Sequence, residues 1–214
     1  MRLMEQWQDA LKTLPLVAIL RGIRPSEAIA IGEMLMQAGF KIVEVPLNSP
    51  EPFDSIKLLV QALGSRAIVG AGTVLNVADV ETLKAVGGQI CISPNANPAV
   101  IRRAKELGLI SFPAFFTPTE AFCAVEAGAD AIKLFPAELA GTTGLKAMKA
   151  VLPKHIPVFP VGGVNPDNMQ DFIEAGAAGF GIGSAVFKPG DTPEVVYKKA
   201  KAFVDGWQRL HKAA

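Results

Sequence analysis

The sequence has little of what metal and triad chemistry require. Among its 214 residues are only two histidines and two cysteines. His155 and His211 provide almost no imidazole for a histidine-built metal site or a Ser-His-Asp triad. Cys91 and Cys123 are isolated in apolar surroundings, without CxxC or His-partnered spacing. We therefore expect both thiols to be small buried hydrophobes in a reducing compartment.

The sequence also lacks a large excess of acidic or basic residues, and it lacks a long apolar segment. The 21 basic and 20 acidic residues leave a net charge of +1, which is not typical of proteins that bind nucleic acid or acidic membranes. The longest uncharged stretch, residues 85–101, contains two prolines and two asparagines and does not resemble a membrane span. The N-terminus carries Glu5 and no apolar signal-peptide segment, so we expect a cytoplasmic protein.

What the chain does contain is a repeated unit: a short apolar run, a polar turn and an amphipathic segment that ends at glycine. Helical patterns are found, for example, at 26–38, 79–86, 98–107, 119–127 and 168–175. Eight apolar runs rich in Val and Ile predict buried parallel strands at 16–20, 42–45, 67–70, 90–93, 110–112, 131–135, 158–161 and 179–183.

Eight such units, each of about 27 residues, predict an α/β fold of the (β/α)8 TIM-barrel class. We expect one domain over residues 1–214, with an additional N-terminal helix at 5–13 covering the bottom of the barrel. A doubly wound open sheet is the alternative. Even spacing, and the lack of a Rossmann-type phosphate loop after the first strand, favour the closed barrel.

Two charged residues are predicted to point into the barrel. Strand residues alternate between faces, so Lys133 lies opposite to the apolar Ile132 and Leu134, which suit the helix-facing side. By the same alternation Glu44 points inward, between Val43 and Val45. A structural ion pair is one interpretation, since isolated buried charges are costly. Both residues lie near the C-terminal ends of their strands, where barrels place their catalytic groups, and this position favours a functional interpretation.

A buried lysine offers a specific reaction. Desolvation and a neighbouring cation such as Arg21 lower the pKa of an amine and make its neutral form plentiful. A neutral amine attacks a carbonyl and forms a Schiff base, which is an electron sink for breaking the adjacent carbon–carbon bond. Glu44 is then the natural proton shuttle. The other special residues at strand ends are Thr73, Pro94, Gly162, Gly163, Gly183 and Ser184.

The glycines after the last two strands indicate an anion site. Exposed backbone N–H groups beside a short helix commonly hold phosphate at this place in a barrel. Gly179, Gly181 and Gly183 alternate along the eighth strand, so its inward face lacks side chains and leaves room for a ligand. Tight packing at strand ends is the alternative interpretation. A dinucleotide fingerprint is disfavoured because no βαβ unit follows.

Six segments together resemble a known family. AILRG (18–22), GAGTV (70–74), SPN (93–95), TPTE (117–120), KLFPA (133–137) and VGGV (161–164) resemble, in order and spacing, the class I aldolases that cleave 2-keto-3-deoxy-6-phosphosugar acids. The resemblance covers about residues 14–204 and implies Lys133 as the Schiff-base lysine and Glu44 as the general acid/base. It implies Arg21 and Thr73 as ligands of the keto-acid carboxylate. It also implies a cytoplasmic homotrimer that needs no metal or organic cofactor.

The resemblance implies the remaining site residues as well. Gly162, Gly163 and Ser184 look like the phosphate site, and we expect Pro94, Val161 and Gly183 to contact substrate too. Family members of the phosphogluconate type have Arg after the catalytic Glu and Thr before the Gly-Gly pair. Here the segments are EVPLNSP (44–50) and Val161, which is similar to the phosphogalactonate type.

One segment departs from the family pattern. PAFF (113–116) replaces the usual Pro-Gly and smaller residues, so we expect Ala114, Phe115 and Phe116 to narrow the aldehyde end of the pocket.

The leading hypothesis is reversible cleavage of 2-dehydro-3-deoxy-6-phosphogalactonate to pyruvate and D-glyceraldehyde 3-phosphate. The alternatives are an aldolase for the gluconate epimer or for both epimers, a phosphosugar epimerase or isomerase, and a non-catalytic phosphosugar-binding barrel. All four predict small phosphorylated ligands and no nucleic-acid or membrane partner.

Overall fold

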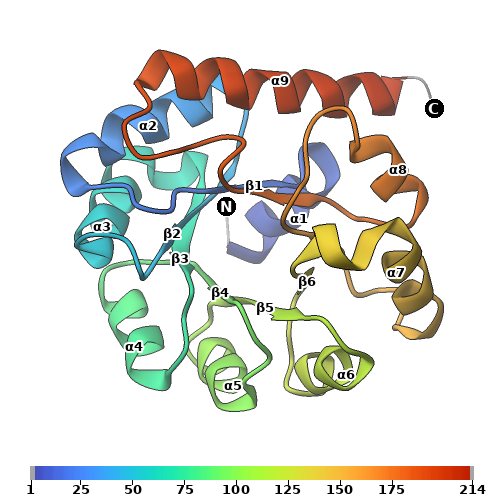
Figure 1. Ribbon diagram of the computed structural model, residues 1–214. Coiled ribbons are helices and arrows are strands. Elements are labelled where there is room, and N and C mark those ends of the chain that lie inside the picture. Colours follow the sequence, from blue (N-terminus) through green and yellow to red (C-terminus); the bar gives the residue numbers. More distant parts are fainter. Residues whose placement is uncertain (1–2, 213–214) are drawn as a thin grey trace.

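The computed structural model describes residues 3–212, so the first two and last two residues of the predicted domain lie outside it (Figure 1). Eight strands alternate with helices along the chain. The strands are β1 Leu16–Ile19, β2 Ile42–Pro46, β3 Ile68–Gly72, β4 Ile90–Ser93, β5 Ile110–Phe115, β6 Ile132–Leu134, β7 Val158–Pro160 and β8 Phe180–Ile182. The helices are α1 Leu3–Thr13, α2 Pro25–Ala38, α3 Pro52–Leu63, α4 Val77–Ala85, α5 Pro98–Glu106, α6 Pro118–Glu126, α7 Ala137–Val151, α8 Met169–Glu174 and α9 Pro193–Lys212, with a 3-10 turn at Gly64–Arg66.

All strand pairs are parallel, and their order around the sheet is β7-β6-β5-β4-β3-β2-β1-β8. An isolated bridge between Val161 and Gly181 joins the two outer strands. The sheet is therefore a nearly closed barrel, and Figure 1 shows helices α2 to α9 around it. The predicted fold class, including the extra N-terminal helix, is confirmed.

The strands separate two apolar layers. Residues that point outward, such as Val43, Val45 and Ile132, belong to a large core shared with the helices. Residues at the beginning of the strands that point inward, such as Ile42 and Ala131, form a smaller core inside the barrel. This inner core fills the N-terminal half of the barrel and leaves its C-terminal half for polar groups.

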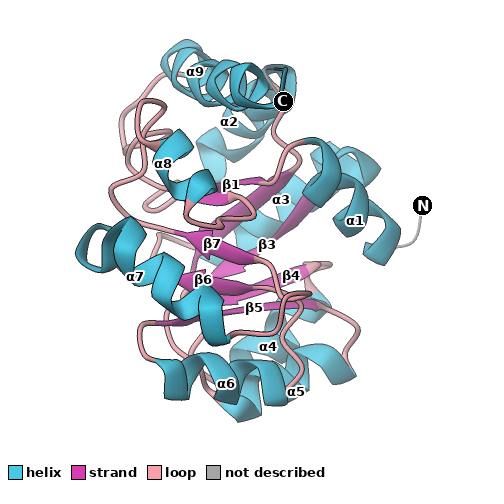
Figure 2. Cartoon of the chain, turned by 90° about the vertical axis from the view of Figure 1, so that its right-hand side faces the viewer, coloured by secondary structure: helices cyan, strands magenta, loops and turns pink. Residues whose placement is uncertain are grey.

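Helix α1 closes the N-terminal end of the barrel. Its Trp7 is buried against Phe112 and Phe159, with ring centroids 6.3 and 6.4 Å away. Figure 2, a view from the side, shows α1 at one end of the strands. The predicted position of this helix is confirmed.

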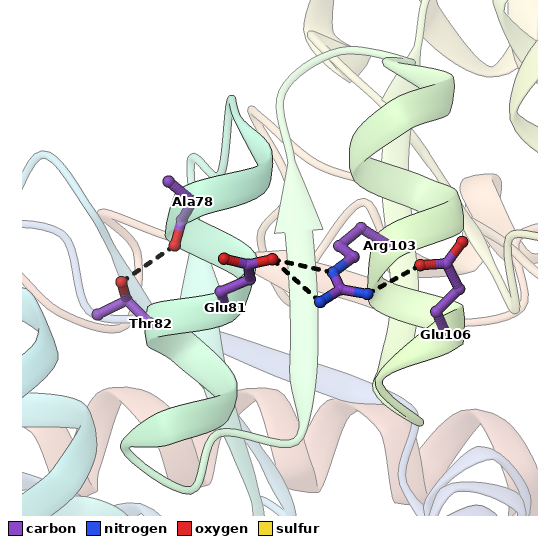
Figure 3. Close-up of polar contacts among 5 residues, drawn as sticks. All are labelled: Ala78, Glu81, Thr82, Arg103 and Glu106. Atoms are coloured by element: carbon purple, nitrogen blue, oxygen red, sulfur yellow. Dashed lines mark hydrogen bonds and ion pairs between the residues drawn. The ribbon is translucent and has the colours of Figure 1, made fainter.

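Polar contacts between neighbouring helices support the outer ring. Figure 3 shows the guanidinium of Arg103 in α5, which donates to Glu81 of α4 at 3.0 Å and to Glu106 of its own helix at 3.0 Å. Thr82 donates its hydroxyl proton to the carbonyl of Ala78 at 3.0 Å, within α4. Among the helices between residues 3 and 212, none combines the length and apolar character that a membrane crossing requires.

The predicted element boundaries agree with the structure to within three residues. The largest shift is in β5, which continues to Phe115 beyond the predicted end at 112. Helix α8 begins at Met169, one residue after the predicted start. The segment before it is a turn, in which Asn165 Oδ1 accepts hydrogen bonds from the N–H groups of Asp167 and Asn168.

Candidate active site

Glu44 and Lys133 both point into the barrel, one layer above its inner apolar core. Glu44 follows the inward Ile42 by two residues on β2. Lys133 of β6 lies two residues after Ala131, an inner-core residue that directly precedes this strand. The two side chains are almost fully buried, with exposed fractions of 2% and 7%. The orientation predicted from strand alternation is therefore confirmed for both residues.

The Glu44 carboxyl group lies over Gly72 of the neighbouring strand β3. A Cβ atom at position 72 would lie 2.6 Å from Glu44 Oε1, so only glycine leaves room for this rotamer. Glu44 Oε2 is buried and accepts no hydrogen bond from the residues in the described range. Burial raises the pKa of Glu44, while the positive charges of Lys133 and Arg21 oppose that rise. Glu44 thus combines a raised pKa with a buried oxygen atom that has no hydrogen-bond donor among the described residues.

The environment of Lys133 favours its neutral amine. Burial is the largest cause of a lowered pKa for Lys133, and the Arg21 charge lowers the pKa further. The Glu44 charge acts in the opposite direction. Lys133 Nζ lies 5.2 Å from the centroid of the Phe135 ring. The expected influence of Arg21 as a neighbouring cation is confirmed.

A cavity of about 440 Å³ opens at the C-terminal end of the barrel. The loops after β1, β6, β7 and β8 supply most of its wall. It is lined by Ile19, Arg21, Phe135, Val161, Gly162, Gly163, Val164, Gly181, Gly183, Ser184, Ala185, Phe187, Lys188 and Pro189.

The structure brings together most of the predicted site residues. Those in the cavity wall are Arg21, Val161, Gly162, Gly163, Gly183 and Ser184. Lys133 adjoins the wall through its contact with Phe135, and Glu44 adjoins it through its pairing with Ile19. Thr73 and Pro94 lie at the ends of β3 and β4, outside the wall of this cavity.

Thr73 has an unusual backbone conformation. It follows Gly72 directly and has φ +58°, a left-handed value that a β-branched residue rarely adopts. Such conformations cost on the order of 1–3 kcal/mol and gather at ligand sites. The predicted role of Thr73 in carboxylate binding is consistent with this strain and stays a prediction.

Two residues after β2 position the loop after β1. Asn48 Oδ1 accepts a hydrogen bond from Arg21 Nη1 at 2.7 Å, and the Ser49 hydroxyl oxygen accepts one from the Gly22 N–H at 2.9 Å. Neither residue was among the site residues predicted from the sequence. The available signal was their position after Glu44 at a strand top, where barrels gather polar groups.

The two glycine-rich loops present unpaired N–H groups beside the cavity. Gly162 and Gly163 have φ values of +107° and +69°, which favour glycine. Within the described chain, several N–H groups of these loops donate no hydrogen bond to protein, among them those of Gly163, Val164, Gly183, Ser184 and Ala185. N–H groups of this kind are typical of anion sites.

The expected empty inward face of β8 is only partly confirmed. A Cβ atom at Gly179 would meet Pro15 and Phe159, and one at Gly181 would meet Val161, so neighbouring residues fill these positions. At Gly183 a Cβ atom would meet nothing within 4 Å. Room for a ligand therefore remains at the last of the three glycines.

The expectation for Phe115 is wrong. Its side chain belongs to the outer core shared with the helices, because it lies an odd number of residues from the inward Phe112. Phe116 is exposed, and neither ring lines the cavity. Ala114 pairs with Lys133 across β5 and β6, so of the three only this residue neighbours a predicted catalytic group.

The expectation of buried thiols is confirmed for Cys91 and only partly met for Cys123. Burial raises the pKa of the Cys91 thiol to about 12, and Cys123 is partly buried. Both are free thiols.

Comparison with known proteins gives consistent results. The family model for KDPG and KHG aldolase matches residues 7–196. The chain is 47% identical, over 95% of its length and 98% of the relative's, to 2-dehydro-3-deoxy-6-phosphogalactonate aldolase of Escherichia coli K12.

Solved structures agree with this similarity. A structure described as native KDPGal matches 93% of this chain and 97% of its own chain with a TM-score of 0.91 and 47% identity. A chain of a designed cube-shaped cage, built by fusing symmetric oligomeric domains, matches 94% of this chain and 74% of its own with a TM-score of 0.92 and 47% identity. With the inward lysine and glutamate, the cavity above them and the match over most of its length, this chain belongs to the KDPG and KHG aldolase family.

Proposed function

We propose that the protein is a class I aldolase that cleaves 2-dehydro-3-deoxy-6-phosphogalactonate reversibly to pyruvate and D-glyceraldehyde 3-phosphate. The observation that carries this proposal is the buried Lys133, with a lowered pKa, inside a barrel that also holds Glu44. The name of the 47% identical relative supports the choice of substrate.

The reaction begins at the amine. Neutral Lys133 Nζ attacks the C2 carbonyl of the substrate, and the resulting carbinolamine takes up one proton from solvent and loses water to give a protonated imine; the final hydrolysis returns this proton to solvent. Burial of Lys133 favours this step because it holds a larger share of the amine in its nucleophilic, unprotonated form.

Glu44 then carries the protons. Its carboxylate accepts the C4 hydroxyl proton as the C3–C4 bond breaks, and the bond electrons move toward the iminium nitrogen to form an enamine. The aldehyde leaves, the Glu44 carboxylic acid protonates C3, and water hydrolyses the imine to release pyruvate and the free amine. The raised pKa of Glu44 makes its carboxylate a stronger base for the first transfer.

The remaining residues bind the two charged ends of the substrate. Arg21, with Thr73 at the end of β3, holds the keto-acid carboxylate, and Pro94 at the end of β4 contacts the substrate without donating a hydrogen bond. Gly162, Gly163, Gly183 and Ser184 hold the phosphate, since their loops offer unpaired N–H groups and open space beside the cavity.

Val161 sets the preference between the two C4 epimers. It is almost fully buried and lines the cavity, so a C4 hydroxyl directed at it gains no hydrogen bond. We expect the phosphogalactonate acid to be cleaved with the higher kcat/KM when both epimers are assayed side by side. A Val161→Thr variant should gain activity on the gluconate epimer, and a clear gluconate preference of the unaltered enzyme would contradict this choice.

The mechanism is tested by trapping the imine. Borohydride added with pyruvate should produce one reduced adduct, located by peptide mass spectrometry at Lys133. A Glu44→Gln variant should still form this adduct, while deuterium exchange at the pyruvate methyl group slows by about 100-fold or more. An unmodified Lys133, or unchanged exchange in the Glu44 variant, would refute the corresponding role.

We further infer that the chain acts as one domain assembled into a cytoplasmic homotrimer. Large apolar side chains are exposed near strand ends, among them Leu75, Phe116 and Leu139, the last of which is 74% exposed. The similarity to a chain used in a cage of symmetric oligomeric domains supports an assembly. Sedimentation equilibrium should give three times the chain mass, and a monomer would refute the trimer.

A further inference from the structure

Asn168 ties together the loop that follows β7. Its Nδ2 donates a hydrogen bond to the Gly163 carbonyl oxygen at 2.9 Å, and its Oδ1 accepts one from the Asn165 N–H at 2.9 Å. Gly163 and Val164 line the cavity, whereas Asn168 does not. The Asn168 side chain therefore hydrogen-bonds to a residue of the cavity wall without lining the cavity itself.

The direction of one peptide group follows from this contact. Gly163 C=O and Val164 N–H belong to the same planar unit, and in a trans peptide these two bonds point in opposite directions. Because the carbonyl points toward Asn168, which does not line the cavity, the N–H of Val164 points away from Asn168, and Val164 itself belongs to the cavity wall. This N–H has no acceptor among residues 3–212, so it is available to a ligand.

Few other contacts hold the Gly163–Val164 peptide in this orientation. Glycine allows several backbone conformations at positions 162 and 163, and both residues have positive φ. Both glycines lie close to Glu138 of α7. A Cβ atom at Gly162 would lie 1.9 Å from Glu138 Oε2, and one at Gly163 would lie 2.9 Å from Glu138 Cβ. This contact blocks larger residues but provides no hydrogen bond to the Gly163–Val164 peptide. Asn168 supplies it.

We propose that Asn168 is a positioning residue, which holds the Gly163–Val164 peptide so that the Val164 N–H donates to the substrate phosphate. The proposal rests on the proposed function, since it adds one donor and its support to the phosphate site of that reaction. Asn168 itself does not touch the substrate. Its effect is on the affinity for phosphate and not on the chemistry at Lys133.

The test measures inorganic phosphate binding to the full chain by isothermal titration calorimetry. In Asn168→Ala the peptide can rotate and its charge-assisted hydrogen bond is weakened, so the dissociation constant for phosphate should rise about tenfold. The KM for the phosphorylated substrate should rise similarly, with kcat changed by less than about twofold. Deuterium exchange at the pyruvate methyl group, which needs no phosphate, should stay within about twofold of the unaltered enzyme.

Asn97→Ala is the matched control. Asn97 also accepts a hydrogen bond at the start of a helix, from the Ala99 N–H at 3.0 Å, and also donates to a preceding carbonyl, that of Leu75. It lies outside the cavity wall, so its removal should leave phosphate binding unchanged. Thermal unfolding of both variants reports whether each is folded.

Asn168→Asp provides a second measurement if the alanine variant does not fold. It keeps an oxygen acceptor for the Asn165 N–H but cannot donate to Gly163, so phosphate should bind it more weakly. Native phosphate affinity in a folded Asn168→Ala or Asn168→Asp variant would overturn the proposal, and so would an equal loss of phosphate binding and pyruvate exchange. If the unaltered enzyme fails to exchange pyruvate protons yet binds phosphate, the proposed function fails while the role of Asn168 is still decided by calorimetry.

Discussion

At the scale of single residues, Lys133 is held where its charge is unfavourable. Burial lowers its pKa, so the folded chain binds a proton at this site less readily than the unfolded chain does. The residue that we propose to react as a neutral amine is thus buried at the expense of folding free energy. A trade-off of this kind between protein stability and activity is common at active sites.

We predict that Lys133→Met raises the free energy of unfolding at pH 7, because methionine binds no proton in the unfolded chain and so loses none on burial, whereas burial disfavours the protonated form of Lys133. The lowered pKa of Lys133 destabilises the folded chain only at pH values where the unfolded chain binds the proton. The stability gained by Lys133→Met should therefore be smallest above the ordinary lysine pKa of about 10.4. It should grow as the pH falls and level off below the folded pKa. Urea unfolding from pH 6 to 11 measures this, and a variant less stable at every pH would contradict it.

Gly72 is predicted to be essential for the placement of Glu44. In Gly72→Ala the new methyl group overlaps the carboxyl group, since its carbon would lie 2.6 Å from Glu44 Oε1. Displacing a proton shuttle by about 1 Å can cost about 100-fold in rate, so pyruvate-methyl exchange should slow by that order while imine trapping persists. Gly144→Ala, in α7, is the control: its Cβ would meet only Ala140, at 3.2 Å. Equal exchange in both variants would show that Gly72 is not required.

Individual side chains were predictable where strand alternation applied. Alternation placed Glu44 and Lys133 inside the barrel. The same rule gives the outward position of Phe115, but it was not applied when Phe115 was expected to narrow the pocket. The roles of Asn48 and Asn168 depend on contacts between loops. No periodic pattern encodes such contacts, so these roles needed coordinates.

At the scale of elements, the outer helices are joined by exposed ion pairs that contribute little. Arg103 bridges Glu106 and Glu81, and both carboxylates, that of Glu106 most strongly, raise the pKa of the Arg103 guanidinium (Figure 3). We predict that Arg103→Met lowers the urea midpoint of unfolding by less than about 0.5 M, and by still less when salt screens the charges. Urea titration at low and high salt tests this, and a larger, salt-independent loss would indicate a packing role for the side chain.

Element positions were predictable because each strand is a short Val- or Ile-rich run followed by a helix with a clear start or stop. Pro25, Pro98 and Pro118 are the first residues of their helices, and Gly39 ends α2 with φ +115°. Helix α7 was harder to recognise. Gly141 interrupts it with φ +63° and ψ −178°, which breaks its helical periodicity.

At the scale of the whole molecule, the barrel has one weak seam. Strands β2 and β3 pair over five residues, whereas β7 and β8 are joined by one bridge, Val161 with Gly181. The hydrogen bond from the Ala178 N–H to the Val158 carbonyl lies beside it.

We predict that opening begins at this seam. Native-state hydrogen exchange should be about tenfold faster at Ala178 than at Ile68 in β3, whose N–H donates to the Lys41 carbonyl beside β2 at 2.8 Å. This is equivalent to an opening free energy lower by about 1.4 kcal/mol. Amide exchange followed by NMR provides the measurement. Similar protection at the two amides would mean that the barrel opens as one cooperative unit.

The pairing of β1 with β8 has a consequence for synthesis on the ribosome. Strand β1 cannot pair with β8 until nearly the whole chain has been translated. Helix α9, which packs on α2, is synthesised later still. Until then the nascent polypeptide carries two open sheet edges, which are ready templates for pairing with other chains. Premature stop codons before Phe180 should therefore yield aggregates rather than a smaller working enzyme.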